Sequence, residues 1–199
     1  MSWSEIALVA VVLLGLALWS VWVTASRLDR LHHKVVASRI ALQAQLDRRS
    51  RAAVDLASAG LLDPASAVLV ADAALAAPGA GDLAAPADRP STAETFALTG
   101  LPAERARGES ALSVTLRSVL DDGTCRALQE DPAGEALLGD LGAAWYRAQL
   151  ARRFHNEAVA QAQRARGPRA VRLLRLAGRA PLPRTVELDD QMPAGLERP

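Results

Sequence analysis

The histidines and the single cysteine are the side chains best suited to bind a metal ion or act as a nucleophile. His32 and His33 are adjacent, so on a helix they point about 100° apart and cannot share an ion. His155 has no Cys or His partner at the spacing of a metal site. Cys125 is the only cysteine, which excludes an intramolecular disulfide. We therefore expect no metal site and no cofactor, and we interpret His155 as a buried or half-buried polar group.

Serines and paired acids offer no second route to catalysis. No serine lies in a G-x-S-x-G motif, the motif in which α/β-hydrolases present their nucleophile. The acid pairs Asp121-Asp122 and Asp189-Asp190 fall in a predicted turn and in the C-terminal tail, where solvation accounts for them. The sequence therefore predicts no catalytic residues and no enzymatic activity. One alternative stays open, an enzyme that uses His155 with a distant carboxylate.

Arginines dominate the last third of the chain and could contact lipid phosphates or nucleic acid. The segment Arg164–Arg184 contains no aromatic residue, so it lacks the stacking platform on which single-stranded nucleic acid binds. We therefore favour contact with anionic lipid, as an alternative function, and do not expect nucleic-acid binding. The arginines concerned are Arg164, Arg166, Arg169, Arg172, Arg175 and Arg179.

A run of twenty residues, Ile6–Ala25, carries no charge and no proline. At about 1.5 Å per residue it reaches roughly 30 Å, the thickness of a bilayer's hydrocarbon core. A cleaved signal peptide would have a shorter apolar stretch behind a basic start, whereas the flank 1–5 contains Glu5 and no basic residue. We therefore predict a retained single-pass transmembrane helix, near whose end His32 and His33 lie at the membrane interface.

Basic residues lie on only one side of this span. Arg27, Arg30, Lys34 and Arg39 follow it within about fifteen residues, the window in which basic residues set topology. This asymmetry predicts that the N-terminus is outside and that the rest of the chain lies in the cytoplasm. We accordingly expect a bacterial-type plasma membrane as the location.

Apolar residues predict an all-α fold for the remainder. They recur at steps of three, four or seven from Leu28 to Leu56, which indicates one long helix over 26–59 that continues out of the membrane. Arg49 falls on this stripe, and we expect its stem to pack there while its head reaches water. Further helices are predicted over 64–77, 103–121 and 132–166, with a short piece at 125–128 and a brief amphipathic helix at 170–177.

Proline, glycine and aspartate mark the predicted boundaries. Asp63-Pro64 restarts the chain as a helix, residues 78–90 form a Pro/Gly-rich connector, and Asp122-Gly123 forms a turn. Residues 185–188 are expected to be extended. The predicted organisation is a flank at 1–5, a transmembrane helix at 6–25, an antiparallel bundle of about four helices at 26–188 and a disordered tail at 189–199.

Two segments carry a resemblance to a known family. One is Gln45-Leu-Asp-Arg48-Arg49, and the other is Ala151-Arg152-Arg153-Phe154-His155-Asn156-Glu157-Ala158-Val159. Together with the N-terminal anchor they resemble the LemA family, whose corresponding segments read L-x-R-R and A-R-x-x-Y-N-x-A-V. Ala111-Leu112-Ser113 with Leu116 is similar to the family's leucine-rich third helix. The chain departs from the pattern at His155, which stands where the family has tyrosine, and over residues 50–56, which replace an acidic-Leu-Ile-Pro-Asn stretch.

The resemblance implies a membrane-tethered antiparallel helical bundle and carries over no established enzymatic activity. We expect the shared polar residues to fix the bundle, and Arg152 and Asn156, one turn apart, to be able to contact each other. The predicted function is an interaction or scaffolding module, with the lipid bilayer and an unidentified protein as partners. The long helices also allow a coiled coil and oligomerisation. The family-motif positions are Arg48, Arg49, Arg152, Arg153, His155 and Asn156.

Overall fold

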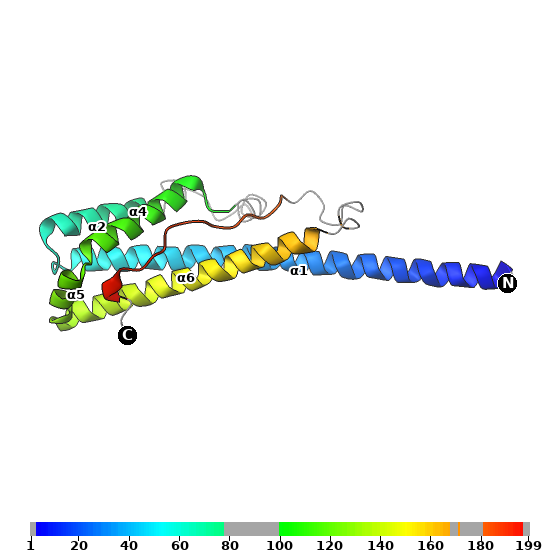
Figure 1. Cartoon of the computed structure of the whole chain (residues 1–199), viewed down its shortest axis with the longest axis horizontal. Coiled ribbons are helices and arrows are strands. Elements are labelled where there is room, and N and C mark those ends of the chain that lie inside the picture. The colour runs from blue at the N-terminus through cyan, green and yellow to red at the C-terminus, as the bar shows by residue number, and fades with distance from the viewer. Residues whose placement is uncertain (1–2, 78–99, 168–170, 172–180, 197–199) are drawn as a thin grey trace.

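The computed structural model describes residues 3–77, 100–167, 171 and 181–196. Within these residues every regular element is a helix, and no strand occurs. Figure 1 shows one long helix that projects from a bundle formed by its own C-terminal half and the remaining helices. The predicted all-α fold with an apolar N-terminal helix is confirmed.

The first helix, α1, runs without a break over Trp3–Ser58 (Figure 1). Its most apolar 18-residue window has a mean hydropathy of 2.6, and none of that window is buried. From Leu28 onwards, where the exposed fraction falls to 8%, the same helix packs its apolar stripe into the bundle. Among the described residues, one helix is therefore long and apolar enough to cross a membrane, and that helix continues into the bundle as predicted.

The second helix, α2, spans Pro64–Ala76 and begins where its capping residues predict. Gly60 has φ of 73°, in the left-handed region that glycine adopts readily after a helix end. The Asp63 carboxylate accepts hydrogen bonds from the backbone N–H groups of Ala65 and Ser66, both at 3.1 Å. Pro64 occupies the first helical position, where no N–H donor is needed.

Helix boundaries near residue 120 differ from the prediction. Helix α4 spans Ala103–Val119, and helix α5 spans Asp122–Gln129. The Asp122-Gly123 pair was predicted as a turn, which is wrong, because both residues belong to the first turn of α5. The cause is Asp121, whose side chain accepts a hydrogen bond of 2.7 Å from the Thr124 backbone N–H and caps the helix there.

The last long helix, α6, spans Pro132–Arg166, with the predicted bounds. It runs antiparallel to α1 and packs along it, while α2 packs on α1 and α4 packs on α2 (Figure 1). The short helix α5 packs on the start of α6. The main core lies among these helices and is formed by buried side chains that include Leu56, Val70, Leu112, Leu116, Leu141 and Trp145.

The C-terminal residues 181–196 form an extended segment that ends in a short 3-10 helix, η1 (Ala194–Leu196). Residues 185–188, which were predicted to be extended, lie in this segment and belong to no helix or turn. The prediction of a disordered tail from Asp189 is wrong for 189–196, because Asp189 and Asp190 are held by ion pairs to Arg117 and Arg152. We call residues 181–196 the strap.

Three predicted features lie outside the described residues. They are the Pro/Gly-rich connector at 78–90, the brief helix at 170–177 apart from Val171, and residues 197–199 of the tail.

Two glycines of α6 give a matched pair of predictions about its packing. A Cβ at Gly134 would lie 2.2 Å from the backbone carbonyl oxygen of Leu128, whereas a Cβ at Gly139 would meet nothing within 4 Å. We expect Gly134→Ala to lower the free energy of unfolding by about 1–3 kcal/mol, because backbone must move. Gly139→Ala should raise it by about 0.5–1 kcal/mol, since alanine favours the helix. Urea unfolding of the full chain in detergent, followed by circular dichroism, measures both, and equal effects would contradict the expected difference.

Candidate functional site

A buried ionic cluster joins α1 to α4. The guanidinium of Arg49 is fully buried and donates to the Glu109 carboxylate at 2.7 Å, to the Glu109 carbonyl at 2.9 Å and to the Ser113 hydroxyl at 3.0 Å. Its Cζ atom lies 4.8 Å from the centre of the Trp145 ring. The prediction that the head of Arg49 reaches water is therefore wrong. The position on the apolar stripe was correct, but α4 and α6 cover it completely.

Arg105 extends this cluster toward the surface. Its side chain is 4% exposed, forms an ion pair with Asp47 of α1, and lies 3.7 Å from the second Glu109 oxygen. Burial raises the pKa of the Glu109 carboxyl, and the positive charges of Arg49 and Arg105 oppose that shift. Two arginines therefore share two carboxylates between α1 and α4, which fixes the register of these helices.

The strap lies between α4 and α6, with one set of contacts on each side (Figure 1). On the α4 side, Arg117 forms an ion pair with the Asp189 carboxylate and donates to the Gln191 carbonyl at 2.8 Å. The Ser113 hydroxyl donates to the Asp189 carbonyl at 2.7 Å, and the Asp189 N–H donates to Ser110 at 3.0 Å. The hydrogen bond from Arg117 lowers the pKa of the Asp189 carboxyl.

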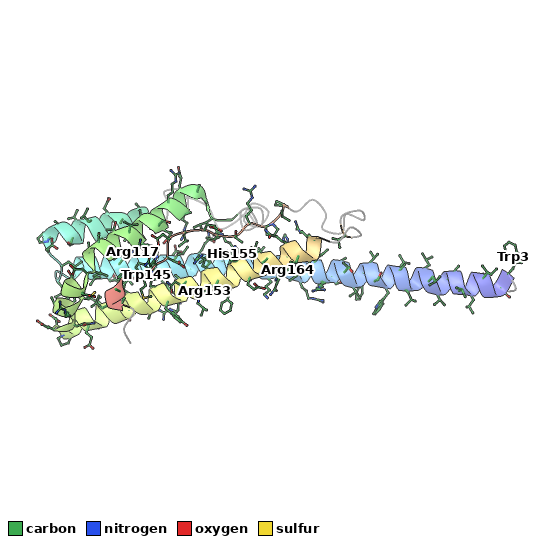
Figure 2. All side chains as sticks on the ribbon, viewed as in Figure 1. Trp3, Arg117, Trp145, Arg153, His155 and Arg164 are labelled. Atoms are coloured by element: carbon green, nitrogen blue, oxygen red, sulfur yellow. The ribbon has the colours of Figure 1, made fainter. Side chains whose placement is uncertain are left out.

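On the α6 side, three side chains converge on Asp190. The Trp145 indole N–H and the Gln149 amide donate to its backbone carbonyl, at 2.9 and 2.7 Å. Arg152 binds its carboxylate through two hydrogen bonds, of 2.7 and 3.0 Å. Such a fork is the strongest and most directional contact available between these groups. Figure 2 labels Arg117 and Trp145, which contact the strap from its two sides.

Further along α6, side chains hydrogen-bond the backbone of the strap. Asn156 accepts from the Val186 N–H at 2.8 Å and donates to the Val186 carbonyl at 3.1 Å, as a neighbouring strand would. Gln163 donates to the Pro183 carbonyl, and Arg166 to the Pro181 carbonyl, both at 2.8 Å. One face of α6 thus follows the strap over most of its length.

The predicted family-motif positions fall into separate environments. Arg49 lies in the ionic cluster, whereas Arg152 and Asn156 both hold the strap. The polar groups of Arg152 and Asn156 therefore hydrogen-bond to Asp190 and Val186, and the expected contact between the two side chains is not formed. Arg48 and Arg153 are exposed (Figure 2 labels Arg153). Sequence reasoning missed Arg117, Trp145 and Gln149, whose shared role is visible only once the strap is in place.

His155 lies on α6, facing α1, and its side chain is fully buried. Its Nδ1 atom is 3.0 Å from the hydroxyl of Ser38, which also donates to the Val35 carbonyl. Burial lowers the pKa of His155 to about 4; the charge of Arg39 adds to this shift, and the Arg184 backbone opposes it. The ring is therefore neutral at pH 7, as expected of a buried polar group. Among the described residues, no group of three His, Cys, Asp or Glu side chains is placed to hold a metal ion.

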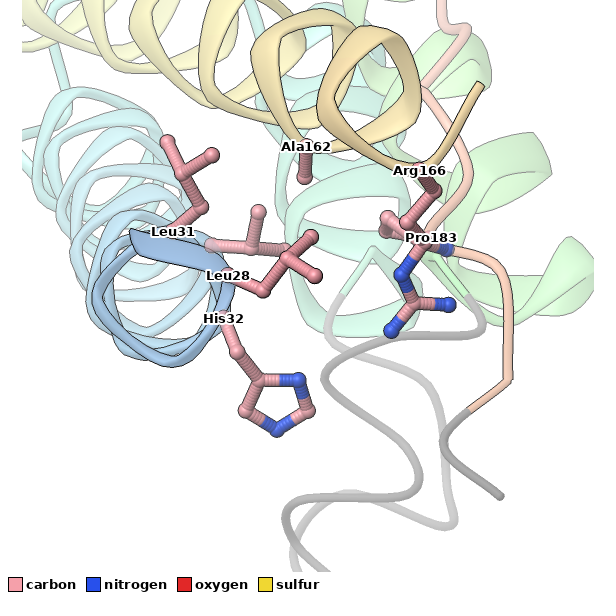
Figure 3. Close-up of a pocket in the computed structure, with 7 residues that line it drawn as sticks. Leu28, Leu31, His32, Ala162, Arg166 and Pro183 are labelled. Atoms are coloured by element: carbon pink, nitrogen blue, oxygen red, sulfur yellow. The ribbon is translucent and has the colours of Figure 1, made fainter. Parts of the chain in front are cut away.

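The end of α6 packs beside the part of α1 that follows the predicted span. A small pocket of about 10 Å³ lies there, with room for about one water molecule. Figure 3 shows residues that line this pocket, namely Leu28, Leu31 and His32 of α1, Ala162 and Arg166 of α6, and Pro183. Of the arginines predicted to contact lipid, Arg164 and Arg166 are therefore brought to this end of the bundle. Arg169, Arg172, Arg175 and Arg179 lie outside the described residues.

Replacing Asn156 tests how firmly α6 holds the strap. Asn156→Ala removes both partners of the Val186 backbone, and we expect a loss of about 1–3 kcal/mol in the free energy of opening of the strap. Hydrogen exchange of the Val186 amide measures this opening directly. Arg153→Ala, on the exposed face of the same helix, is the matched control and should leave the exchange unchanged. Equal exchange rates in Asn156→Ala and the wild type would show that the two hydrogen bonds between Asn156 and Val186 do not stabilise the closed strap.

Comparison with known proteins gives no match to this chain: no family model, no curated protein and no solved structure is similar to it at a significant level.

Proposed function

We propose that the protein is a single-pass membrane protein whose helical bundle acts as an interaction or scaffolding module, with no reaction of its own. The observation that carries this proposal is the continuity of α1. Its exposed apolar part, with no buried residue in the most apolar window, passes directly into the stripe that forms the bundle. A helix with such an exposed apolar surface is unfavourable in water and favourable in a bilayer.

The orientation is part of the same proposal. Arg27, Arg30 and Lys34 are exposed on α1 immediately after the apolar segment. Basic residues in this position are retained on the cytoplasmic side. The N-terminus is then outside a bacterial-type plasma membrane, and the bundle is in the cytoplasm.

Membership of the LemA family, as a divergent member, is a further part of the proposal and rests on the segments quoted above. The two segments lie on α1 and α6, which pack together as antiparallel neighbours. Arg49, Arg152 and Asn156 each bind a partner on another element. This is the bundle-fixing role that the resemblance implies for these positions. Oligomerisation through the long helices remains an expectation.

Protease accessibility tests the anchor and its orientation. The full chain should remain in the membrane fraction after carbonate extraction. Its bundle should be cleaved in inverted vesicles and protected in intact cells, as judged with a C-terminal epitope tag. Recovery in the soluble fraction would contradict the anchor, and cleavage in intact cells would contradict the orientation. Pulldown of the full chain in detergent then tests the scaffolding role, which the recovery of no specific partner would contradict.

Contact with anionic lipid is a second candidate, favoured by the position of the end of α6. Arg166 lines the pocket beside Leu28 and His32, close to the end of the predicted span. Arg164 lies on the same end and pairs with Glu157 at 3.0 Å in an exposed contact that lipid phosphate could replace. Hydrogen exchange over 160–167 should slow in nanodiscs of anionic lipid relative to zwitterionic lipid, and salt should reverse the effect. A hydrogen-exchange rate over 160–167 that depends on neither lipid charge nor salt would exclude this function.

A further inference from the structure

The strap is bound in the manner of a peptide in a groove. Side chains of α4 and α6 hydrogen-bond its main chain at several positions along its length. The strap carbonyl groups that accept these bonds belong to Pro181, Pro183, Val186, Asp189, Asp190 and Gln191. Main-chain contacts of this kind hold an extended segment without specifying most of its side chains.

Two arginines specify acidic side chains at adjacent positions. Arg117 of α4 pairs with Asp189, with one hydrogen bond of 3.0 Å, and Arg152 of α6 binds Asp190 through a fork. The four side chains are between 17% and 36% exposed. These ion pairs are therefore partly open to water and salt, and are worth less than buried ones.

An apolar floor specifies one further position. Val186, which is 1% exposed, packs against Leu42 and Leu46 of α1 and Ala148 of α6. Pro183 and Pro193 are also buried, whereas Leu182, Arg184, Thr185, Glu187 and Gln191 of the strap are exposed. The groove thus selects a small apolar residue three positions before the first of two acids. Of the two residues between them, Glu187 is exposed, whereas Leu188 is partly buried against the same floor.

The helices form their main core without the strap. The fully packed side chains of that core all belong to helices α1, α2, α4, α5 and α6 or to the residues that join them, and the strap adds only the partly buried Met192 and Leu196 at its edge. Opening of the strap would therefore preserve the contacts between the helices of the main core and uncover the polar walls and apolar floor of the groove.

We propose that this groove is a peptide-binding site for an extended acidic segment of a partner protein, and that the strap occupies it as an intramolecular competitor. This inference rests on the proposed function, that the bundle is an interaction module, and identifies its binding surface and its class of ligand. The ligand carries a valine-like residue followed, three positions on, by two adjacent carboxylates. Because a tethered competitor acts at a high effective concentration, a partner binds only when it matches these contacts or when the strap is weakened.

A labelled peptide with the sequence of residues 181–196 is the probe. We compare its binding, by fluorescence anisotropy, to the full wild-type chain in detergent and to the chain with Asp189→Asn and Asp190→Asn, whose strap is weakened but whose groove is intact. The variant should bind at least about tenfold more tightly than the wild type, because hydrogen bonds to charged groups are lost from the competitor alone. A peptide carrying the same two substitutions should bind the variant at least about tenfold more weakly than the unchanged peptide.

Groove variants in the weakened-strap background complete the test. Arg117→Gln with Arg152→Gln should weaken binding at least about tenfold, whereas Arg147→Gln, an exposed arginine elsewhere on α6, should not change it. As a second measurement, excess unlabelled peptide should accelerate hydrogen exchange of the Val186 amide in the isotopically labelled wild-type chain, which requires no variant to fold.

Three results would overturn the proposal. One is no binding by a weakened-strap chain with native circular dichroism together with unchanged Val186 exchange in the wild type. The second is equal affinity of the weakened-strap chain for the unchanged peptide and for the peptide that lacks the two carboxylates. The third is a wild-type dimer that dissociates on Arg152→Gln, which would assign the groove to the strap of a second copy. None of these measurements depends on the anchor or its orientation, so the failure of this inference and of the proposed membrane location can be told apart.

Discussion

Glu109→Gln is expected to lower the free energy of unfolding of the bundle by about 3–5 kcal/mol, because it leaves the buried charge of Arg49 without its partner. Both side chains are completely buried and their charged atoms are 2.7 Å apart. Neither the Ser113 hydroxyl nor the Trp145 ring, which also contact Arg49, carries a compensating negative charge. Urea unfolding of the full chain in detergent, followed by circular dichroism, gives the value.

A double variant separates the charge from the packing. Arg49→Met with Glu109→Leu replaces the pair by apolar side chains of similar size, and such replacements are often neutral or stabilising. We expect it to recover most of the stability that Glu109→Gln loses. Asp140→Asn, an exposed position on α6, is the control for the loss of one carboxylate and should change stability by less than about 0.5 kcal/mol. A Glu109→Gln protein within about 1 kcal/mol of the wild type would show that Glu109 is already neutral in the folded bundle.

Protonation of His155 is expected to lower the free energy of unfolding by about 3 kcal/mol as the pH falls from 7 to 4. The pKa of His155 is lowered from 6.5 to about 4 in the folded chain, mainly by burial. Between these values the unfolded chain binds the proton and the folded chain does not. The contribution of His155 to the free energy of unfolding is therefore fully present above pH 6.5 and is lost as the pH falls toward 4. The magnitude follows from about 1.4 kcal/mol for each pH unit.

His155→Gln removes this titration while keeping a polar group beside Ser38. The free energy of unfolding, measured at pH 7, 5.5 and 4, should fall less steeply for this variant than for the wild type. His33→Gln, whose side chain is exposed, should keep the wild-type slope. Carboxylates such as Asp189 also lose stabilising contacts in acid, and they do so equally in all three proteins. Identical slopes for His155→Gln and the wild type would contradict a buried neutral imidazole.

Local sequence patterns predicted most of the helical framework. The Asp63-Pro64 pair placed the start of α2 correctly because capping depends on residues within one turn. The start of α6 at Pro132 was likewise correct. The apolar stripe from Leu28 to Leu56 likewise predicted which face of α1 enters the bundle. The Asp121 cap was missed because Asp122-Gly123 equally favours a turn.

The site could not be predicted in the same way, because its partners are far apart in the chain. Arg49 and Glu109 are 60 residues apart, and Arg117 and Asp189 are 72 residues apart. Polarity and proline made the end of the strap, from Asp189 onwards, resemble a disordered tail, since no periodic pattern marks a segment that is held by side chains of two helices. Two signals were nevertheless present: an arginine on an apolar stripe, and the alternation of Val186 and Leu188 immediately before two acids.

In the proposed single-pass arrangement, the unbroken course of α1 would set the height and the stiffness of the bundle above the membrane. A helix that continues from Ala25 to Ser58 rises about 50 Å, at about 1.5 Å per residue, with no hinge residue to absorb a bend. Arg49 would then lie roughly 36 Å along the helix from the end of the predicted span. Because α1 is one unbroken helix, a rotation or tilt of its apolar segment would also move the part of α1 that lines the groove. In that arrangement a ligand for the proposed groove would have to reach that height, which a soluble protein can do.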